Sequence, residues 1–139
     1  MILGVDVSTS ITGFAIVADG EIVFYDSVDL RKQKSMFDKA IIIKEKIINI
    51  YEMYQLNNDD DPTWGDSNYP IKHIYVEQPF TFFNSGGSSA KTMAALQKFN
   101  GIVSWILYEL FEIRPEYIGA TAARKHAGIK VPRGQKAKQ

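Results

Sequence analysis

A chain of 139 residues, 45% of them hydrophobic, is long enough for one domain with one core and too short for two, so we expect a single domain over residues 1–139. It has no cysteine and no apolar run that could cross a bilayer, which excludes disulfides, thiolate metal sites and membrane spans and predicts a cytoplasmic protein without a membrane partner. Its formal net charge of zero argues against binding nucleic acid through bulk charge.

The first 28 residues predict three neighbouring strands. Met1–Val7 is almost continuously apolar, Thr12–Ala18 is apolar, and Glu21–Val28 alternates between apolar and polar residues. Asp19-Gly20, between the last two segments, is a strong hairpin signal because both turn residues accept a positive φ. The chain therefore opens with an antiparallel meander.

Helices and strands alternate after the meander. Ser35–Leu56 predicts an amphipathic helix, followed by a polar loop over residues 57–70 and a short strand, Ile71–Val76, that ends in Glu77. The apolar positions at helical spacing in this helix are Phe37, Ala40, Ile41, Ile47, Ile48, Tyr51 and Tyr54. A second long helix is expected from about Ser89 to Phe111.

The end of the chain predicts a strand at Tyr117–Ala120, a short helix at Thr121–Ala127, and a loop that enters a further helix. The order βββ-α-β-α-β-α predicts an α/β fold with a mixed five-stranded sheet, whose first three strands are antiparallel and whose flanks are covered by helices.

The second helix carries two apolar faces. The stripe that should face the sheet consists of Leu96, Phe99, Val103, Ile106, Leu107 and Leu110. A second patch, roughly opposite, consists of Ala94, Gly101, Trp105 and Tyr108. Because one face packs the core and the other is left for a partner, the sequence predicts a homodimer.

Two carboxylates follow apolar strands. Asp6 ends the first strand and Glu77 ends the fourth, and if these strands are neighbours both acids emerge at one end of the sheet. Their mutual repulsion would be reversed by a bound divalent cation, as magnesium-dependent phosphoryl transfer requires. The open alternative for Asp6 is a turn aspartate that caps the loop after it.

Small and hydroxyl-bearing residues surround Asp6. We expect Gly4 and Gly13 to let backbones approach closely. Ser8 and Thr12, together with Thr9, offer hydroxyls that would suit a phosphate or a metal-bound water.

An aromatic loop follows Glu77. Phe80, Phe82 and Phe83 lie near Gly86 and Gly87, where packing all three rings into a core is hard to arrange. Exposed aromatic rings beside glycines suit stacking on unpaired bases or wedging into a helix step. The alternative is a loop that folds its rings back onto the sheet.

Charge is unevenly distributed along the chain. Residues 1–80 carry 7 Lys or Arg and 13 Asp or Glu, whereas residues 81–139 carry 9 and 3. The basic residues from position 124 onward are Arg124, Lys125, Lys130, Arg133, Lys136 and Lys138. This basic end indicates either a surface for a polyanion or an ordinary solvated tail.

Taken together, these motifs resemble the RuvC-like Holliday-junction resolvases, which are metal-dependent DNA endonucleases with an RNase H-like fold. The matching segments are Gly4-Val5-Asp6 with Thr12-Gly13, then Val76-Glu77-Gln78-Pro79-Phe80, and a glycine-containing helix through Ala94–Gly101. The resemblance covers essentially the whole chain. It implies that Asp6 and Glu77 are ligands of Mg²⁺, for which Mn²⁺ substitutes.

The resemblance also implies contacts with DNA. Phe80 would insert at the crossover of a four-way junction, with Phe82, Phe83 and Asn84 beside it. Lys125 and Lys136 would lie near the scissile phosphate, where Lys136 would offset charge in the transition state. Further candidate DNA contacts are Arg124, Lys130, Arg133 and Lys138, plain solvation being the alternative for the last two.

The implied function is the resolution of four-way junctions and related branched DNA by paired nicks, for which a twofold dimer supplies two sites. Resolvases of this type carry one or two further carboxylates on a helix after the segment matching Gly134–Lys138, whereas here no acidic residue follows Glu116. We therefore expect a truncated form that lacks the final helix and does not cleave, the alternative being an inactive relative.

Two other functions stay open. One is a module that binds branched DNA without cutting it. The other is an RNA-processing nuclease of the YqgF type, although the arginine of that group's motif is missing between Thr9 and Gly13. No nucleotide cofactor is expected, because 139 residues cannot supply the second domain of a sugar-kinase relative.

Overall fold

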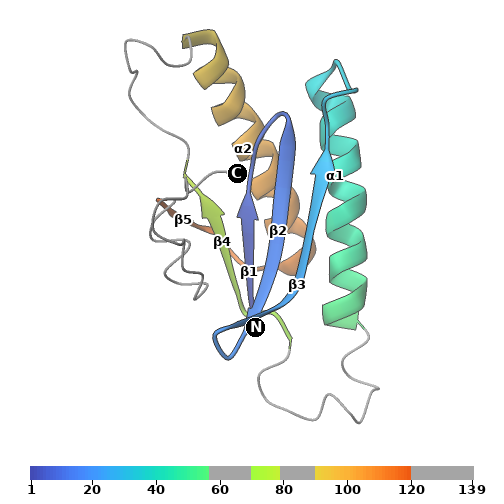
Figure 1. The fold of residues 1–139 in the computed structure, drawn as a ribbon, viewed down its shortest axis with the longest axis vertical. Coiled ribbons are helices and arrows are strands. Elements are labelled where there is room, and N and C mark those ends of the chain that lie inside the picture. Colours follow the sequence, from blue (N-terminus) through green and yellow to red (C-terminus); the bar gives the residue numbers. More distant parts are fainter. Residues whose placement is uncertain (57–69, 79–89, 120–139) are drawn as a thin grey trace, which may run out of the picture.

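The computed structural model describes residues 1–56, 70–78 and 90–119. The strands are β1 (Ile2–Asp6), β2 (Ile11–Ala18), β3 (Glu21–Asp29), β4 (His73–Glu77) and β5 (Glu116–Ile118). They form one sheet in the order β3-β2-β1-β4-β5, with β1 at its centre. β1 pairs antiparallel with β2 and parallel with β4 (Figure 1). The predicted mixed five-stranded sheet with three antiparallel strands first is confirmed.

The β2–β3 hairpin turns where the sequence predicts it. Asp19 and Gly20 have φ values of 54° and 79°, which is the backbone conformation that a tight hairpin needs at both turn residues. The strand register shifts between Ile16 and Val17, so the edge strand β3 carries one irregularity.

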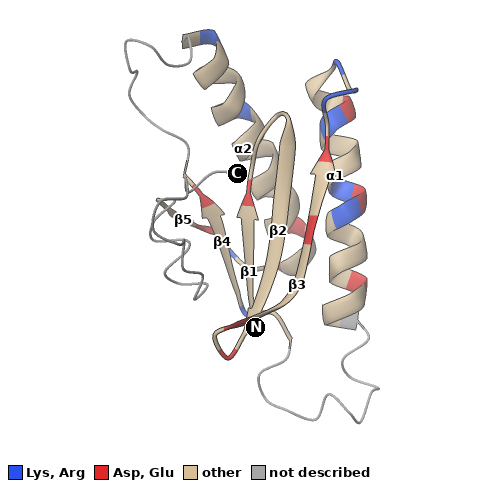
Figure 2. Cartoon of the chain, viewed as in Figure 1, with Lys and Arg blue, Asp and Glu red and all other residues tan. Residues whose placement is uncertain are grey.

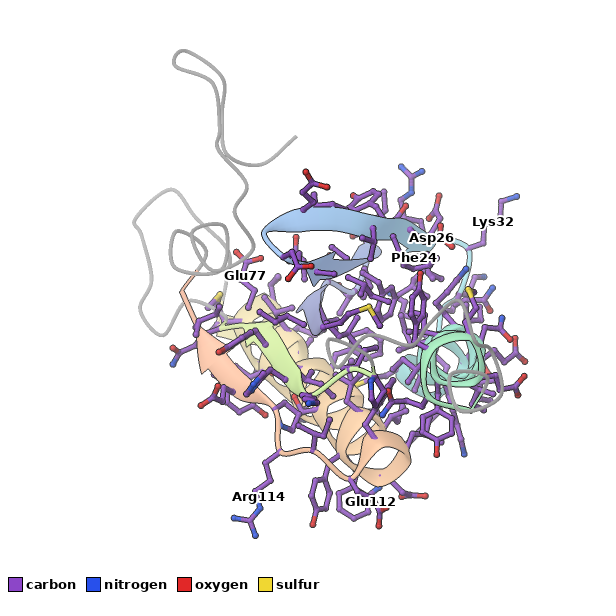
Figure 3. The ribbon with its side chains drawn as sticks, turned by 90° about the horizontal axis from the view of Figure 1, so that it is seen from below. Phe24, Asp26, Lys32, Glu77, Glu112 and Arg114 are labelled. Atoms are coloured by element: carbon purple, nitrogen blue, oxygen red, sulfur yellow. The ribbon has the colours of Figure 1, made fainter. Side chains whose placement is uncertain are left out.

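Two helices cover one face of the sheet and pack against each other (Figure 3). α1 (Met36–Tyr51) begins at Ser35, whose side chain accepts a hydrogen bond of 3.1 Å from the backbone N–H of Phe37. α1 continues into one π-helical turn, η1 (Glu52–Leu56), which the sequence pattern did not predict. α2 (Ala90–Phe111) is followed directly by Glu112, which has a φ of 58°.

The core lies between the sheet and the two helices. Its fully buried members are Leu3, Phe14, Ile16, Ile74 and Val76 from the strands and Ile43, Ile47, Ile50, Phe99, Val103 and Leu107 from the helices. Two edge-to-face ring contacts add to it, Phe24 with Tyr54 at 5.9 Å and Tyr51 with Phe111 at 5.2 Å between centroids. None of the described helices is long and apolar enough to cross a membrane.

Each helix buries part of its predicted stripe. In α1, Ala40 and Ile47 are buried as predicted, whereas Phe37 and Ile41 are 75% and 56% exposed. Ile43 and Ile50, which the predicted stripe omitted, are buried in this face of α1. In α2, Phe99, Val103 and Leu107 are buried as predicted, whereas Leu96, Ile106 and Leu110 are only half-buried. Two polar residues that the stripe omitted, Asn100 and Ser104, take their place in the buried face.

One ion pair ties α1 to the edge strand. Asp26 lies on the side of β3 that faces α1, together with Phe24 (Figure 3), and Lys46 of α1 donates a hydrogen bond to its carboxylate. This bond, followed by one from the backbone N–H of Ser27, lowers the pKa of Asp26. The pair helps to hold the α1 layer against the sheet.

Candidate metal site

Asp6 and Glu77 are the last residues of β1 and β4, two neighbouring strands that run parallel. Their pairing ends at Val5 and Val76, so continuing the register by one residue places Asp6 beside Glu77, with strands about 4.8 Å apart. Figure 2 shows acidic residues at the carboxyl ends of both strands. The structure therefore brings both acids to the same end of the sheet, as expected if their strands are neighbours.

The carboxylate of Asp6 is exposed, and among residues 1–56, 70–78 and 90–119 no side chain or backbone group forms a hydrogen bond or ion pair with it. The alternative in which Asp6 caps the loop after it is wrong, because Ser8 does this instead. The Ser8 Oγ accepts a hydrogen bond of 3.1 Å from the backbone N–H of Ser10. Asp6 thus presents a carboxylate that the described structure does not use internally.

The loop after Asp6 is held by a buried hydroxyl. Thr12 is fully buried, and its Oγ1 donates to the carbonyl oxygen of Ser8 at 2.8 Å and accepts from the N–H of Ser8 at 3.2 Å. Lys39 of α1 adds a bond of 2.7 Å from its Nζ to the carbonyl oxygen of Thr9. The expectation that Thr12 offers its hydroxyl to a ligand is therefore wrong. This hydroxyl shapes the loop that follows the candidate ligand.

The two glycines near the site are not required by close packing. A Cβ built on Gly4 would lie 3.9 Å from the carbonyl oxygen of Ala15, and one on Gly13 would lie 3.8 Å from the hydroxyl of Tyr25. Both distances are ordinary van der Waals contacts. The expected close approach of backbones at these positions is therefore wrong.

A buried amide on α2 reaches the backbone of Glu77. Asn100 is only 5% exposed, and its Nδ2 donates a hydrogen bond of 3.2 Å to the carbonyl oxygen of Glu77. Ser104, 7% exposed, donates its hydroxyl to the carbonyl oxygen of Asn100 at 2.8 Å. The sequence analysis missed both residues. The available signal was their spacing of four, which places them on one side of the helix beside Phe99, Val103 and Leu107.

Basic residues lie at the same end of the sheet as the two acids. Arg31, Lys32 and Lys34 are exposed in the connection from β3 to α1, and β3 ends on the same side as β1. Arg31 clamps Asp29 through bonds of 3.0 Å from Nε and 2.7 Å from Nη2, which lower the pKa of Asp29 to about 2. This end therefore combines positive side chains with the Asp6 and Glu77 carboxylates.

The chain is similar to known proteins in its structure, whereas its sequence matches none of those compared. No family model and no curated protein matches the sequence. The structure of T. thermophilus RuvC in complex with a Holliday junction substrate has a TM-score of 0.62 and 15% identity, covering 96% of this chain and 83% of that one. A second Thermus thermophilus RuvC structure has a TM-score of 0.59 and 13% identity, covering 95% of this chain and 72% of that one.

The fold is RNase H-like. In this RNase H-like sheet, the two acids of the candidate site come from the central strand and its parallel neighbour. The described part of the chain holds no group of three or more His, Asp or Glu placed to bind a metal ion, so the candidate metal site has two carboxylates there.

The other candidate site residues lie outside the described residues. They are Phe80, Phe82, Phe83, Asn84, Arg124, Lys125, Lys130, Arg133, Lys136 and Lys138. Their contacts with DNA, and the catalytic role of Lys136, stay predictions within the RNase H-like framework.

Proposed function

We propose that this chain carries the metal-binding and junction-binding part of a structure-selective DNA endonuclease that acts on four-way junctions and related branched DNA. The observation that carries the proposal is the placement of Asp6 and Glu77 side by side at the carboxyl ends of two parallel strands. It gains support from the likeness of the whole described fold to a RuvC structure that holds a Holliday junction substrate.

The two carboxylates suit a hydrated hard cation. Mg²⁺ is usually held by one or two carboxylates and keeps several waters, and Mn²⁺ takes similar oxygen ligands. The exposed and unpaired Asp6 in the described structure, next to Glu77, meets this requirement. When bound, the ion would supply an activated water and would stabilise charge that develops on the scissile phosphate.

The protein's own contribution is to orient the two acids and to bind phosphate. Thr12 and Lys39 fix the loop that follows Asp6. Basic residues would bind the DNA backbone, with Lys136 nearest the reacting phosphate and the Phe80 loop at the crossover.

A homodimer completes the proposal, since two symmetric nicks require two sites. Trp105 and Tyr108 on α2 are 59% and 38% exposed, and their ring centroids lie 5.9 Å apart. Gly101 lies near them in sequence, and nothing lies within 4 Å of a Cβ built on it. Sedimentation of the parent chain and of Trp105→Glu tests this. A parent that stays monomeric at tens of micromolar would contradict the dimer.

A second candidate function is a module that binds branched DNA without a metal centre. It is favoured by the absence of a third ligand near Asp6 and Glu77 in the described residues. The two functions differ in one measurable respect, because only the nuclease-type site makes Mn²⁺ binding depend on Asp6 and Glu77.

The deciding experiment measures Mn²⁺ binding by electron paramagnetic resonance and junction binding by gel shift, for the parent chain, Asp6→Asn and Glu77→Gln. Asp38→Asn, which alters an exposed acid in the first turn of α1, is the matched control. We expect only the two site variants to lose Mn²⁺, and the parent to bind a four-way junction more tightly than a duplex of the same sequence. Equal Mn²⁺ binding by all four proteins would refute the metal site. Tighter binding to structured RNA would favour an RNA-processing nuclease.

A further inference from the structure

We propose that Asn100 is a positioning residue that fixes the backbone of Glu77 so that its carboxylate can meet the metal ion beside Asp6. This role rests on the metal site proposed above. It concerns a residue of α2 that touches neither the cation nor DNA and acts through the peptide group of a ligand.

The peptide group between Glu77 and Gln78 is held at both of its polar ends. Its carbonyl oxygen accepts a hydrogen bond of 3.2 Å from the Nδ2 of Asn100. Its N–H, which belongs to Gln78, donates to the carbonyl oxygen of Ile118 at 2.7 Å. Because a peptide group is planar, two bonds at opposite ends fix the orientation of the whole plane. That plane restricts the ψ angle of Glu77 and so limits the directions in which its side chain can leave the strand.

The position of Glu77 in the sheet explains why a helix supplies one of these bonds. The pairing of β1 with β4 ends at Val5 and Val76, so Glu77 lies one residue beyond the last pair. A partly buried carbonyl oxygen at that point needs another donor. The amide of Asn100 supplies it from the helix layer. Its burial among apolar side chains is unfavourable without such a bond, which accounts for a polar residue in this face of α2.

Ser104 supports the backbone from which the amide extends. Its single hydroxyl hydrogen is donated to the carbonyl oxygen of Asn100 at 2.8 Å, and the Oδ1 of the same residue lies at 3.5 Å. The NH₂ group of Asn100 is the end that faces Glu77, because the carbonyl oxygen of Glu77 can only accept a hydrogen bond. The network therefore runs from Ser104 through Asn100 to the backbone of the candidate ligand, and each of its side chains is buried.

Side chains that hold metal ligands in place usually contribute about 10–100-fold to metal affinity. Asn100 acts on the backbone of Glu77 rather than on its carboxylate, so we expect the lower end of that range. Asn100→Leu, which keeps the branching of the side chain and removes the donor, should weaken Mn²⁺ binding about tenfold. Ser104→Ala, which leaves the amide in place but less ordered, should weaken it by a smaller factor.

The matched control is Val103→Ala. Val103 is fully buried in the same face of α2 and lies between the two network residues in sequence. Its apolar side chain cannot form a hydrogen bond to the peptide group of Glu77. It should lower the stability of the fold and leave Mn²⁺ affinity unchanged. Mn²⁺ binding is measured on the 139-residue chain by electron paramagnetic resonance, at a temperature where circular dichroism shows each variant to be folded.

The possible results separate the positioning role from a merely structural one. Weaker Mn²⁺ binding in the Asn100 and Ser104 variants but not in Val103→Ala supports the proposal. Unchanged affinity in Asn100→Leu, or an equal loss in Val103→Ala, overturns it. If Asn100→Leu does not fold, Ser104→Ala decides alone by the same comparison. If Glu77→Gln binds Mn²⁺ as the parent does, the proposed metal site is wrong, and the positioning role of Asn100 is wrong with it. The Glu77→Gln measurement thus distinguishes failure of the metal site from failure of the positioning role alone.

Discussion

Replacing Thr12 by valine tests the loop that follows Asp6. Valine has nearly the same shape as threonine, so Thr12→Val removes the hydroxyl and leaves packing in this fully buried position almost unchanged. The lost hydroxyl donates to the carbonyl oxygen of Ser8 at 2.8 Å and accepts from its N–H at 3.2 Å. Each such bond contributes roughly 0.5–1.5 kcal/mol, so the variant should lose about 2 kcal/mol of unfolding free energy.

The same position offers its own control. Thr12→Ser keeps both hydrogen bonds and removes one methyl group, which costs about 1 kcal/mol in a buried site. Urea unfolding followed by circular dichroism should therefore rank the parent above Thr12→Ser and Thr12→Ser above Thr12→Val. In thermal unfolding, Thr12→Val should melt about 6–8 °C below the parent. A Thr12→Val protein as stable as Thr12→Ser would refute the role assigned to the hydroxyl.

Three further predictions concern the sheet, its ion pair and DNA. Gly4→Ala should leave the unfolding free energy unchanged or raise it by up to ~1 kcal/mol, because the added Cβ meets only the carbonyl oxygen of Ala15 at 3.9 Å; a clear loss in urea unfolding would contradict this. The pKa of Asp26 is lowered mainly by its hydrogen bond with Lys46. The stabilisation from this pair is therefore present above the unfolded-state pKa of about 3.9 and is lost as the pH falls through the lower folded-state pKa. Lys46→Met should therefore flatten the acid side of a plot of melting temperature against pH, and an unchanged slope would disprove the pairing. The 139-residue chain should bind a labelled four-way junction without nicking it, since the described residues supply only two carboxylates to the site, fewer than a two-metal site uses. If two phosphate contacts are screened, the affinity should drop about tenfold over a fourfold rise in salt. Symmetric nicking with Mg²⁺ would show that Asp6 and Glu77 suffice.

The sheet could be predicted from sequence because its signals are local. Asp19-Gly20 fixed the hairpin, and apolar runs marked each strand within one or two residues. Asp6 and Glu77 stood out for the same reason, since each follows an apolar run directly. To predict that the two acids lie side by side, only the parallel pairing of β1 with β4 had to be added.

The missed features depend on three-dimensional partners. Asn100 and Ser104 are polar, and a pattern based on hydrophobicity assigns such residues to solvent. Asn100 is buried because its amide donates a hydrogen bond to the carbonyl oxygen of Glu77, which lies beyond the last β1–β4 pair. The hydroxyl of Thr12 points to Ser8 because of a loop conformation that no spacing rule encodes. Phe37 is apolar yet exposed, because the register of α1 is set by Ile43, Ile47 and Ile50 further along the helix.

The central place of β1 bears on the order in which the molecule assembles. β1, β2 and β3 are joined by short connections, whereas Asp6 and Glu77 are separated by about 70 residues of chain. Closing a loop of that length costs about 4 kcal/mol of chain entropy before β4 gains any contact. We therefore expect the meander to form early in refolding and the β1–β4 pair to form late. At the proposed metal site, Mn²⁺ uptake would require the β1–β4 pair, so a stopped-flow signal from Mn²⁺ should trail the signal from formation of the meander.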